Sequence, residues 1–171
     1  MTQLDLLEAT QLSANRCLTR EEILGVQDKI PEMIEAGQML PVEHLMKWTH
    51  HFTDPDTKYG CGMYAREMFL PKGGFIVGKL HKQPHLSVVL KGKIIVFSEK
   101  GKHYFEAPCV LPSHPGDKRI GYAVEDTIWL TVHLTKHLSE EKMDDIEEEV
   151  IAKSYEELER FMALENKEVQ S

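Results

Sequence analysis

The fold is decided by residues 70–92, which have the sequence LPKGGFIVGKLHKQPHLSVVLKG. Two short runs with alternating apolar residues, 75–80 and 86–90, flank a polar turn. Short alternating runs bounded by Gly, Pro and polar residues are typical of β-strands. His81 and His85 stand at the two ends of the turn. The stretch therefore predicts a hairpin with one imidazole on each side of its turn.

The same pattern of short apolar runs and polar turns continues on both sides of this hairpin. Further strands are expected at residues 63–70, 93–98, 103–105, 109–111, 120–123 and 127–134. Many short strands with regularly spaced turns favour an all-β sandwich or barrel. We therefore expect a mainly β fold.

Helices are expected before the strands. Thr19, followed three residues later by Glu22, is a capping box, in which each side chain accepts from the other residue's backbone N–H. A helix is therefore predicted to start there. Pro31 is predicted to interrupt it, since proline removes one helical hydrogen bond. A second short helix with Met39 on its apolar face would follow, and Gly37 is a candidate for its end.

A second helical region is expected at the C-terminal end. Apolar residues recur at helical spacing in the acidic run after residue 139, at Met143, Ile146, Val150 and Ile151. Ser154 and Glu157 form another capping box, which predicts a last helix over 155–164. The chain is thus divided into an N-terminal helical segment (1–47), a β-barrel (48–137) and an acidic C-terminal helical segment (138–171).

Charge and composition exclude some partners. The formal net charge is −8, and the part from Ser139 onward, with 12 acidic and 4 basic residues, accounts for all of it. An acidic end is unsuited to duplex nucleic acid. No apolar run reaches the roughly 18 residues of a membrane helix, so no membrane partner is expected. The start lacks signal-peptide features, and three widely spaced cysteines fit a reducing compartment, so a cytoplasmic protein is expected.

Residues 73–92 resemble the first motif of the cupin family, which has the order Gly, His, His, Glu, Gly at fixed spacing. Gly73, Lys79, His81, His85 and Gly92 occupy those positions here. The spacing is kept, but Lys79 stands in place of the first His and His85 in place of the Glu. The resemblance implies a cupin-like double-stranded β-helix barrel with these side chains directed into its cavity.

The second cupin motif is less well kept. Pro108, His114, Gly116, Arg119 and Ala123 fall on its positions, and only Gly116 matches. Arg119 takes the place of the usual metal-binding His. The resemblance thus implies that a cation replaces a metal ligand at this position.

A longer part of the chain, about residues 48–152, is similar to a group of small uncharacterised phage and prophage proteins with a cupin-like core. The segments that carry this similarity are HHF at 50–52, GMYARE at 62–67, GKLHK at 78–82, HL at 85–86, PGDKRIGYAVEDTIW at 115–129 and TVH at 131–133. The similarity implies a phage origin and action inside a bacterial host. It implies no particular activity.

Cations in place of metal ligands favour an anion pocket. Arg119 can hold an oxyanion with two hydrogen bonds, and Lys79 can act as a point charge. His81 and His85 can donate hydrogen bonds, and Arg66 adds a cation if it points inward. The pocket would suit a nucleotide, another phosphorylated metabolite or an acid. The alternative for Arg119 is a structural ion pair, for which Glu125 and Asp126 are the nearest candidates along the sequence.

Two aromatic residues are candidate ligand contacts. Tyr64 and Trp129 can stack on a base or sugar ring. Aromatic residues in short strands belong more often to the core, and we favour the core for Trp129. Only one of the adjacent His50 and His51 can face the pocket, since neighbouring residues of a strand point to opposite faces.

A metal site is the alternative to the anion pocket. His81, His85 and His133 can form a three-histidine site for Zn²⁺, Ni²⁺ or Fe²⁺, because His133 lies near the end of a late strand. Otherwise, His81 and His85 only bond across the mouth of the hairpin.

Three functions follow from these alternatives. The first is a phage cupin that binds a small anionic ligand, such as a host defence signal that it sequesters. The second is a metal-dependent isomerase, dioxygenase or lyase that uses His81, His85 and His133. The third is a phage structural or assembly protein with a vestigial cavity. A homodimer or larger homo-oligomer is expected, through the sheets or through the helix over 155–164.

Overall fold

The structure, a computed structural model, describes residues 17–37 and 42–168. Its strands are β1 (Lys47–Phe52), β2 (Gly62–Leu70), β3 (Phe75–Val77), β4 (Leu80–His81), β5 (His85–Lys91), β6 (Lys93–Ser98), β7 (Gly101–Glu106), β8 (Cys109–Ser113), β9 (Arg119–Ala123), β10 (Thr127–Thr135) and β11 (Ile151–Ala152). Its helices are α2 (Arg20–Glu35), η1 (Val42–His44), η2 (Glu140–Lys142), α3 (Met143–Val150) and α4 (Tyr155–Glu168).

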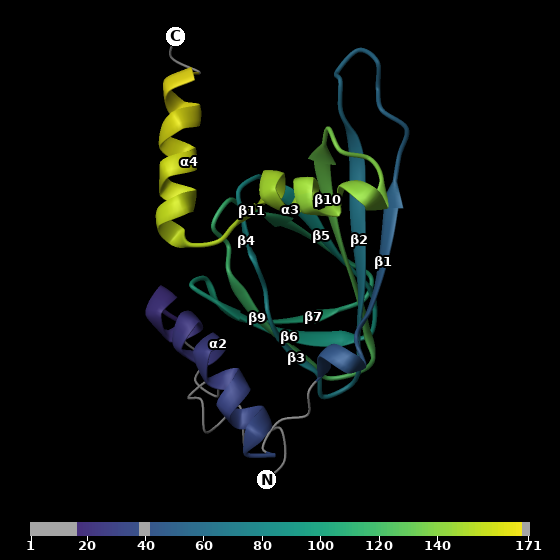
Figure 1. The fold of residues 1–171 in the computed structure, drawn as a ribbon. Helices are drawn as coiled ribbons and strands as arrows, with labels where there is room; N and C mark the ends of the chain where they lie inside the picture. The colour runs from purple at the N-terminus through teal and green to yellow at the C-terminus, as the bar shows by residue number, and fades with distance from the viewer. Residues whose placement is uncertain (1–16, 38–41, 169–171) are drawn as a thin grey trace.

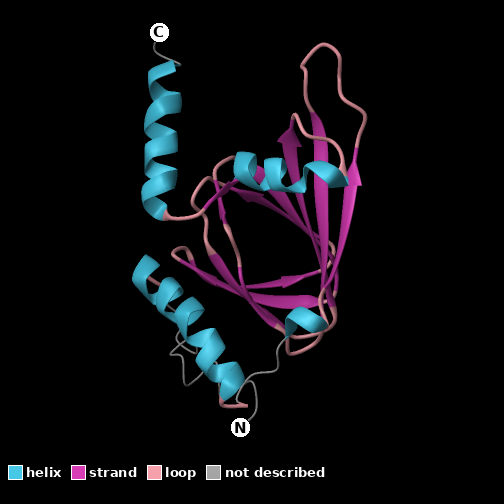
Figure 2. Ribbon diagram, viewed as in Figure 1, coloured by secondary structure: helices cyan, strands magenta, loops and turns pink. Residues whose placement is uncertain are grey.

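Two antiparallel sheets face each other across the interior (Figure 1). One has the strand order β1-β2-β10-β5-β8 and the other β3-β9-β6-β7. Without β1, these orders place eight strands as in a jelly roll, the two-sheet arrangement that cupins share. The predicted mainly β, cupin-like barrel with helices at both ends is confirmed (Figure 2).

Two strands differ from the prediction. The expected strand over residues 75–80 is divided into β3 and β4, with Gly78 and Lys79 between them. β3 pairs with β9, whereas β4 pairs with β11 of the C-terminal segment. The predicted hairpin between 75–80 and 86–90 is therefore wrong, because β5 pairs with β10 and β8 instead. The sequence analysis missed β1 and β11, and β1 extends the larger sheet beyond β2.

Helix α2 covers the outer face of the four-stranded sheet. Ile23 and Val26 of the helix pack with Phe75, Phe97 and Ile120 of the sheet. Between the two sheets lies a separate apolar cluster, which contains Met68, Leu70, Val89, Ile94, Val96 and Ala123. The N-terminal helix therefore shares a core with the barrel.

The capping box at the start of α2 is present in full, with Thr19 and Glu22 each accepting from the other's backbone N–H. The predicted interruption at Pro31 is wrong, since α2 continues through it to Glu35. Proline removes only one helical hydrogen bond, and residues on both sides of it pack on the sheet. Gly37, with φ of 65°, follows the end of the helix. The predicted role of Met39 lies outside the described residues.

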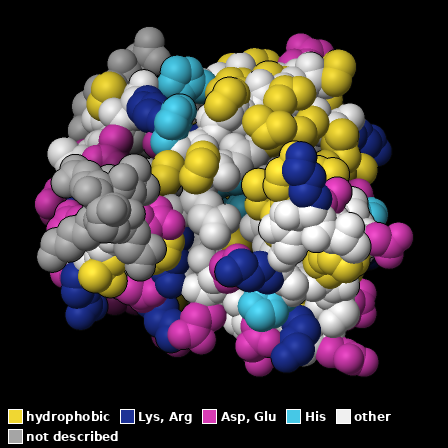
Figure 3. Space-filling view, turned by 90° about the horizontal axis from the view of Figure 1, so that it is seen from above, with side chains coloured by type: hydrophobic (Ala, Val, Ile, Leu, Met, Phe, Trp, Pro, Cys, Tyr) yellow, Lys and Arg dark blue, Asp and Glu magenta, His cyan; other side chains and the backbone are white. Residues whose placement is uncertain are grey.

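Helix α3 lies across one end of the barrel (Figure 1). Its buried Ile146 and Val150 pack against Tyr64. In the view from above, hydrophobic side chains gather on the side where β2 and β10 stand (Figure 3). No helix in the described part of the chain has the length and apolar character to cross a membrane.

The last helix begins where the sequence predicted, and it extends to Glu168. The Ser154 hydroxyl accepts from the Glu157 N–H at 3.2 Å. The Glu157 carboxylate, however, accepts from the Lys153 N–H at 3.0 Å and pairs with Lys82 at 2.8 Å. This contact joins α4 to the turn that separates His81 from His85.

Candidate metal centre and its cavity

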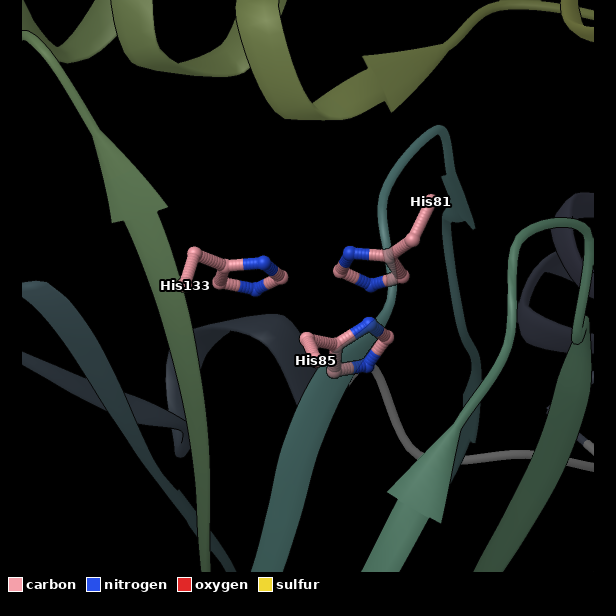
Figure 4. Close-up of side chains that lie close together, drawn as sticks. All are labelled: His81, His85 and His133. Carbon is pink, nitrogen blue, oxygen red and sulfur yellow. The ribbon is translucent and has the colours of Figure 1, made fainter. Parts of the chain in front are cut away.

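Three buried histidines point toward one another inside the barrel (Figure 4). His81 belongs to β4, His85 to β5 and His133 to β10. Their exposed fractions are 8%, 8% and 2%. One ring nitrogen from each lies within 4.8 Å of one from each of the others. The structure thus places the predicted third histidine, His133, beside His81 and His85.

Strand pairing explains why these residues meet. In β5, residues alternate between the two faces, and His85, Ser87 and Val89 are all buried on the inner one. β10 pairs with β5 so that Thr131 lies opposite Ser87, and His133 is the next inward residue of β10. The turn after β4 returns the chain toward the barrel and brings His81 next to His85, with ring centroids 4.1 Å apart.

The ring nitrogens of this cluster lack enough protein partners. Among the described residues, Nδ1 of His81 and both ring nitrogens of His133 have no hydrogen-bond partner. Nδ1 of His85 lies 3.3 Å from the carbonyl oxygen of Gln83. A carbonyl only accepts, so this nitrogen carries the proton and Nε2 keeps its lone pair. Buried polar atoms without partners are costly, and a bound metal ion would satisfy them, so these residues fit a metal.

Burial keeps the three imidazoles neutral. It lowers the pKa of His85 to about 4, with the Arg119 charge acting in the same direction. It lowers the pKa of His133 to about 3, together with the neighbouring His85. The pKa of His81 is lowered further by burial and by the other two histidines. At neutral pH all three rings therefore hold the lone pairs that coordinate metal ions.

The stability of the metal-free protein is expected to fall as pH decreases from 6.5 to 5. In this range the unfolded chain binds protons on histidine, whose ordinary pKa is 6.5, while buried His85 stays neutral. Because the pKa of a buried histidine is lower in the folded state, the free energy of unfolding falls as the pH decreases below 6.5. The decrease is up to about 1.4 kcal/mol per pH unit for each such histidine. Urea unfolding of chelator-treated protein at several pH values measures this slope. Equal slopes for the wild type and His85→Gln would contradict the assignment.

A cavity of about 550 Å³ opens beside this cluster. His81 and His85 line it, whereas His133 is not among the lining residues. Most of the remaining wall is apolar, from Trp48, Met68, Ile76, Val77, Ile94, Val96, Trp129 and Met143. The polar lining includes His50, Arg66, Lys79, Ser87, Asp117, Arg119, Thr131 and Glu147. A mainly apolar cavity with a few convergent polar groups is typical of small-molecule sites.

Arg119 lies on β9 and contributes one cation to the cavity wall. Its guanidinium donates to the Ser113 hydroxyl at 2.7 Å and to the Asp117 carboxylate at 3.2 Å. The sequence analysis gave Glu125 and Asp126 as candidate ion-pair partners of Arg119. In the structure its partner is Asp117 instead. Asp117 lies in the tight turn before β9, two residues ahead of Arg119, and it accepts from the His114 N–H at 3.0 Å.

Arg66 and Lys79 share one carboxylate, that of Glu147 on α3. Nη1 of Arg66 lies 3.2 Å from Oε1 of Glu147. Nζ of Lys79 lies 2.5 and 2.6 Å from the two carboxylate oxygens. The Lys79 side chain is 49% exposed, so it stands at the rim. These two cations, which the sequence analysis assigned to the ligand, are thus paired within the chain.

The two predicted aromatic contacts occupy different places. Trp129 is partly buried and lines the cavity as well as packing on the core. Tyr64 is buried in the cluster with α3, outside the cavity lining. Its hydroxyl is 2.8 Å from Nδ1 of His50, and burial raises its pKa to about 12. His50 lines the cavity and His51 pairs with Glu67 on the outside, as alternation along a strand requires.

Three of the cavity residues that the sequence analysis missed contact the cations it had predicted. Trp48 belongs to the unpredicted β1, and the Arg66 guanidinium lies over its ring at 5.3 Å. Glu147 is one of many carboxylates in the acidic segment and has no local signal of its own. Asp117, two residues before Arg119, had a signal, because an acidic residue close to a pocket arginine is a candidate partner for it.

No protein-family model and no curated protein match this sequence. Parts of solved structures are similar to it. A RmlC-like cupin from Shewanella frigidimarina is 16% identical, with 51% of this chain and 92% of that chain covered and a TM-score of 0.38.

A cupin domain from Bordetella pertussis is 10% identical over 53% of this chain and 93% of that chain, with a TM-score of 0.40. A cupin 2 conserved barrel domain protein from Leptotrichia buccalis is 12% identical over 53% and 41% of the two chains, with a TM-score of 0.44. At these values the fold assignment rests on the strand order, and the similarity says nothing about activity.

Proposed function

We propose that this protein binds a divalent transition metal ion through His81, His85 and His133 and, next to it, a small organic anion in the cavity. The observation that carries the proposal is the unsatisfied buried cluster, above all His133, whose two ring nitrogens have no partner in the described part of the chain. A buried histidine that served only the core would be expected to have a hydrogen-bond partner.

The ligand set favours particular metals. Three neutral imidazoles suit Zn²⁺, Ni²⁺ or Fe²⁺ and disfavour the oxygen-seeking Mg²⁺ and Ca²⁺. A site with three protein ligands keeps a position for water or a ligand. When bound, such a metal would act as a Lewis acid toward an oxygen atom of the ligand. Since His81 and His85 line the cavity, the open position would be on the cavity side.

The cavity wall supplies the second half of the site. Arg119 is held by Ser113 and Asp117, so its guanidinium is already oriented for an anion. The apolar wall suits the carbon skeleton of the ligand and keeps water away from it. The anion binding predicted first from the sequence and the metal binding predicted as its alternative thus become two parts of one site.

Binding is favoured over catalysis by the state of the carboxylates. The described cavity wall holds two, Asp117 and Glu147, and both are in ion pairs with cations. Neighbouring cations hold the pKa of each below its ordinary value, which makes both poor bases. A metal-dependent isomerase, dioxygenase or lyase therefore stays the second candidate. The third, a structural protein with a vestigial cavity, predicts no metal.

A nucleotide or phosphorylated metabolite stays a prediction from the sequence. So does the sequestering of a host defence signal by a phage protein in the bacterial cytoplasm. The metal and the cavity support a narrower class, an anion with an apolar skeleton and at least one carboxylate or phosphate group.

Metal analysis of the full chain tests the proposal. Protein that has been stripped by a chelator and incubated with Zn²⁺, Ni²⁺ or Fe²⁺, then desalted, is expected to retain about one equivalent of one of these metals, as three-histidine sites do. Co²⁺ in the same site should give the visible absorption of a low-coordinate centre. Retention of less than about a tenth of an equivalent of each metal would overturn the proposal and favour the structural protein.

A further inference from the structure

The outer face of the five-stranded sheet is unusually apolar. An antiparallel sheet with one face in water normally alternates apolar residues inside with polar residues outside. Here most outward positions of four neighbouring strands are apolar as well. They are Met63, Ala65 and Phe69 of β2, Ile128, Leu130, Val132 and Leu134 of β10, Leu86, Val88 and Leu90 of β5, and Val110 and Pro112 of β8. We name this surface the outer β10 face.

The strand register makes the outer β10 face continuous. Val132 lies opposite Ala65 on one side and Leu86 on the other, and Leu86 lies opposite Pro112. The next row runs from Leu130 through Val88 to Val110, and on the other side of Leu130 it ends in the carboxylate Glu67. Leu86 is 47% exposed, and Val110 and Leu134 are each 60% exposed. Figure 3 shows hydrophobic side chains gathered on this side of the molecule.

The outer face of the four-stranded sheet is also apolar, but a helix covers it. α2 covers the outer face of the four-stranded sheet, where it packs on Phe75, Phe97 and Ile120. α3 lies across the end of the barrel and packs on Tyr64, which points inward. Among residues 17–37 and 42–168, no helix packs on the outer β10 face. It is therefore a face of the sandwich that lacks a cover.

We propose that a second copy of this chain covers the outer β10 face. The surface is an open sheet face with a single outward carboxylate near its centre, Glu67, which pairs with His51 at 3.3 Å. A partner must be similarly broad and almost uncharged, and the same face of another copy meets both conditions. With strands about 4.8 Å apart and about 3.3 Å per residue, the apolar rows cover roughly 400 Å² of sheet. This suits the apolar centre of an interface that buries about 800 Å² on each partner.

The contact is expected to be face to face. β8 is one edge of the sheet, and it contains Pro112, which lacks an N–H and so opposes the addition of another strand. Two such sheets pack about 10 Å apart with their outward side chains interleaved. The inward faces of β5 and β10 carry His85 and His133, and the partner supplies no residue to the cavity. The proposed dimer and the proposed metal site can therefore be tested independently of each other.

Light scattering during size-exclusion chromatography of the full chain tests this proposal. At about 20 μM, far above the dissociation constant of a standard interface, the mass should be twice the 19.6 kDa of one chain. Leu86→Glu places a carboxylate at the centre of the face and is expected to shift the protein to monomer. Val110→Glu, on the edge strand and 60% exposed, should have the same effect with less risk to folding.

Leu164→Glu on α4 is the matched control, because Leu164 is 62% exposed and apolar but lies on the other predicted interface. It should leave the dimer intact, and circular dichroism should show all three variants folded. A monomeric wild type would overturn the proposal, whether the face stays open or is covered by the chain itself. It would also be overturned if Leu164→Glu separated the copies while the folded Val110→Glu did not.

Discussion

Replacing His133 with alanine is expected to reduce the retained metal from about one equivalent per chain to less than a tenth. The change removes one of three ligands and leaves a pair, which is too few for a tight site. The affinity should fall by more than the roughly 10- to 100-fold that follows loss of a group supporting a ligand. Metal analysis after desalting gives the occupancy, and competition with a chromophoric chelator gives the affinity.

His103→Ala is the control for that experiment, since His103 is an exposed histidine of β7 outside the cluster. It should leave the metal content unchanged. His133→Asn, which keeps a polar side chain of smaller size, guards against a loss of metal that only reflects unfolding. If folded His133→Asn or His133→Ala retained a full equivalent, His133 would not be a ligand and the proposed centre would be wrong.

The histidine cluster could largely be predicted from the sequence, because it depends on local rules. The two-residue period of a strand places His85, Ser87 and Val89 on one face, and all three are buried. The same rule applied to the late strand made His133 a candidate. A short turn between β4 and β5 then brings His81 back to His85. The orientation of each side chain needs only near neighbours in the sequence, whereas the meeting of His133 with His85 depends on the pairing of β10 with β5 in the barrel.

The charged side of the cavity could not be predicted in the same way. The acidic segment offers many carboxylates of equal local character, and only the packing of α3 decides which of them reaches the cavity. Ile146 and Val150 pack inward on Tyr64, and this fixes the rotation of the helix. Met143 and Glu147, one helical turn apart, then line the cavity. Glu147 can therefore pair with Arg66 and Lys79, which lie far away in the sequence.

Lys79 illustrates why the motif spacing was insufficient. The spacing placed it on the same strand as His81, so both would point the same way. In the structure Lys79 lies between β3 and β4, which pair with different strands. Its amine pairs with Glu147 of α3 at the rim of the cavity. Long-range pairing thus overrides the local alternation at this position.

Loss of the Arg119 guanidinium is expected to weaken anion binding by about 10- to 100-fold, since a hydrogen bond to a charged group contributes about 1.5–3 kcal/mol. Arg119 differs from Arg66 and Lys79, because its partners Ser113 and Asp117 lie on its own side of the cavity and leave it next to His85. Isothermal titration of metal-loaded Arg119→Ala with oxalate and with inorganic phosphate measures the change. Arg119→Lys should give an intermediate affinity, since lysine keeps the charge but lacks the planar fork.

Lys100→Ala is the matched control for Arg119→Ala. Lys100 pairs with the same Asp117 at 2.7 Å, yet its side chain is 58% exposed and it does not line the cavity. Its removal should change anion affinity by less than about twofold, as for an exposed ion pair. The metal content of Arg119→Ala should stay near that of the wild type, which separates a failed anion site from a failed metal site. Equal anion affinities for Arg119→Ala and the wild type would show that the cavity holds its ligand without this arginine, and the proposed anion site would be wrong even with the metal in place.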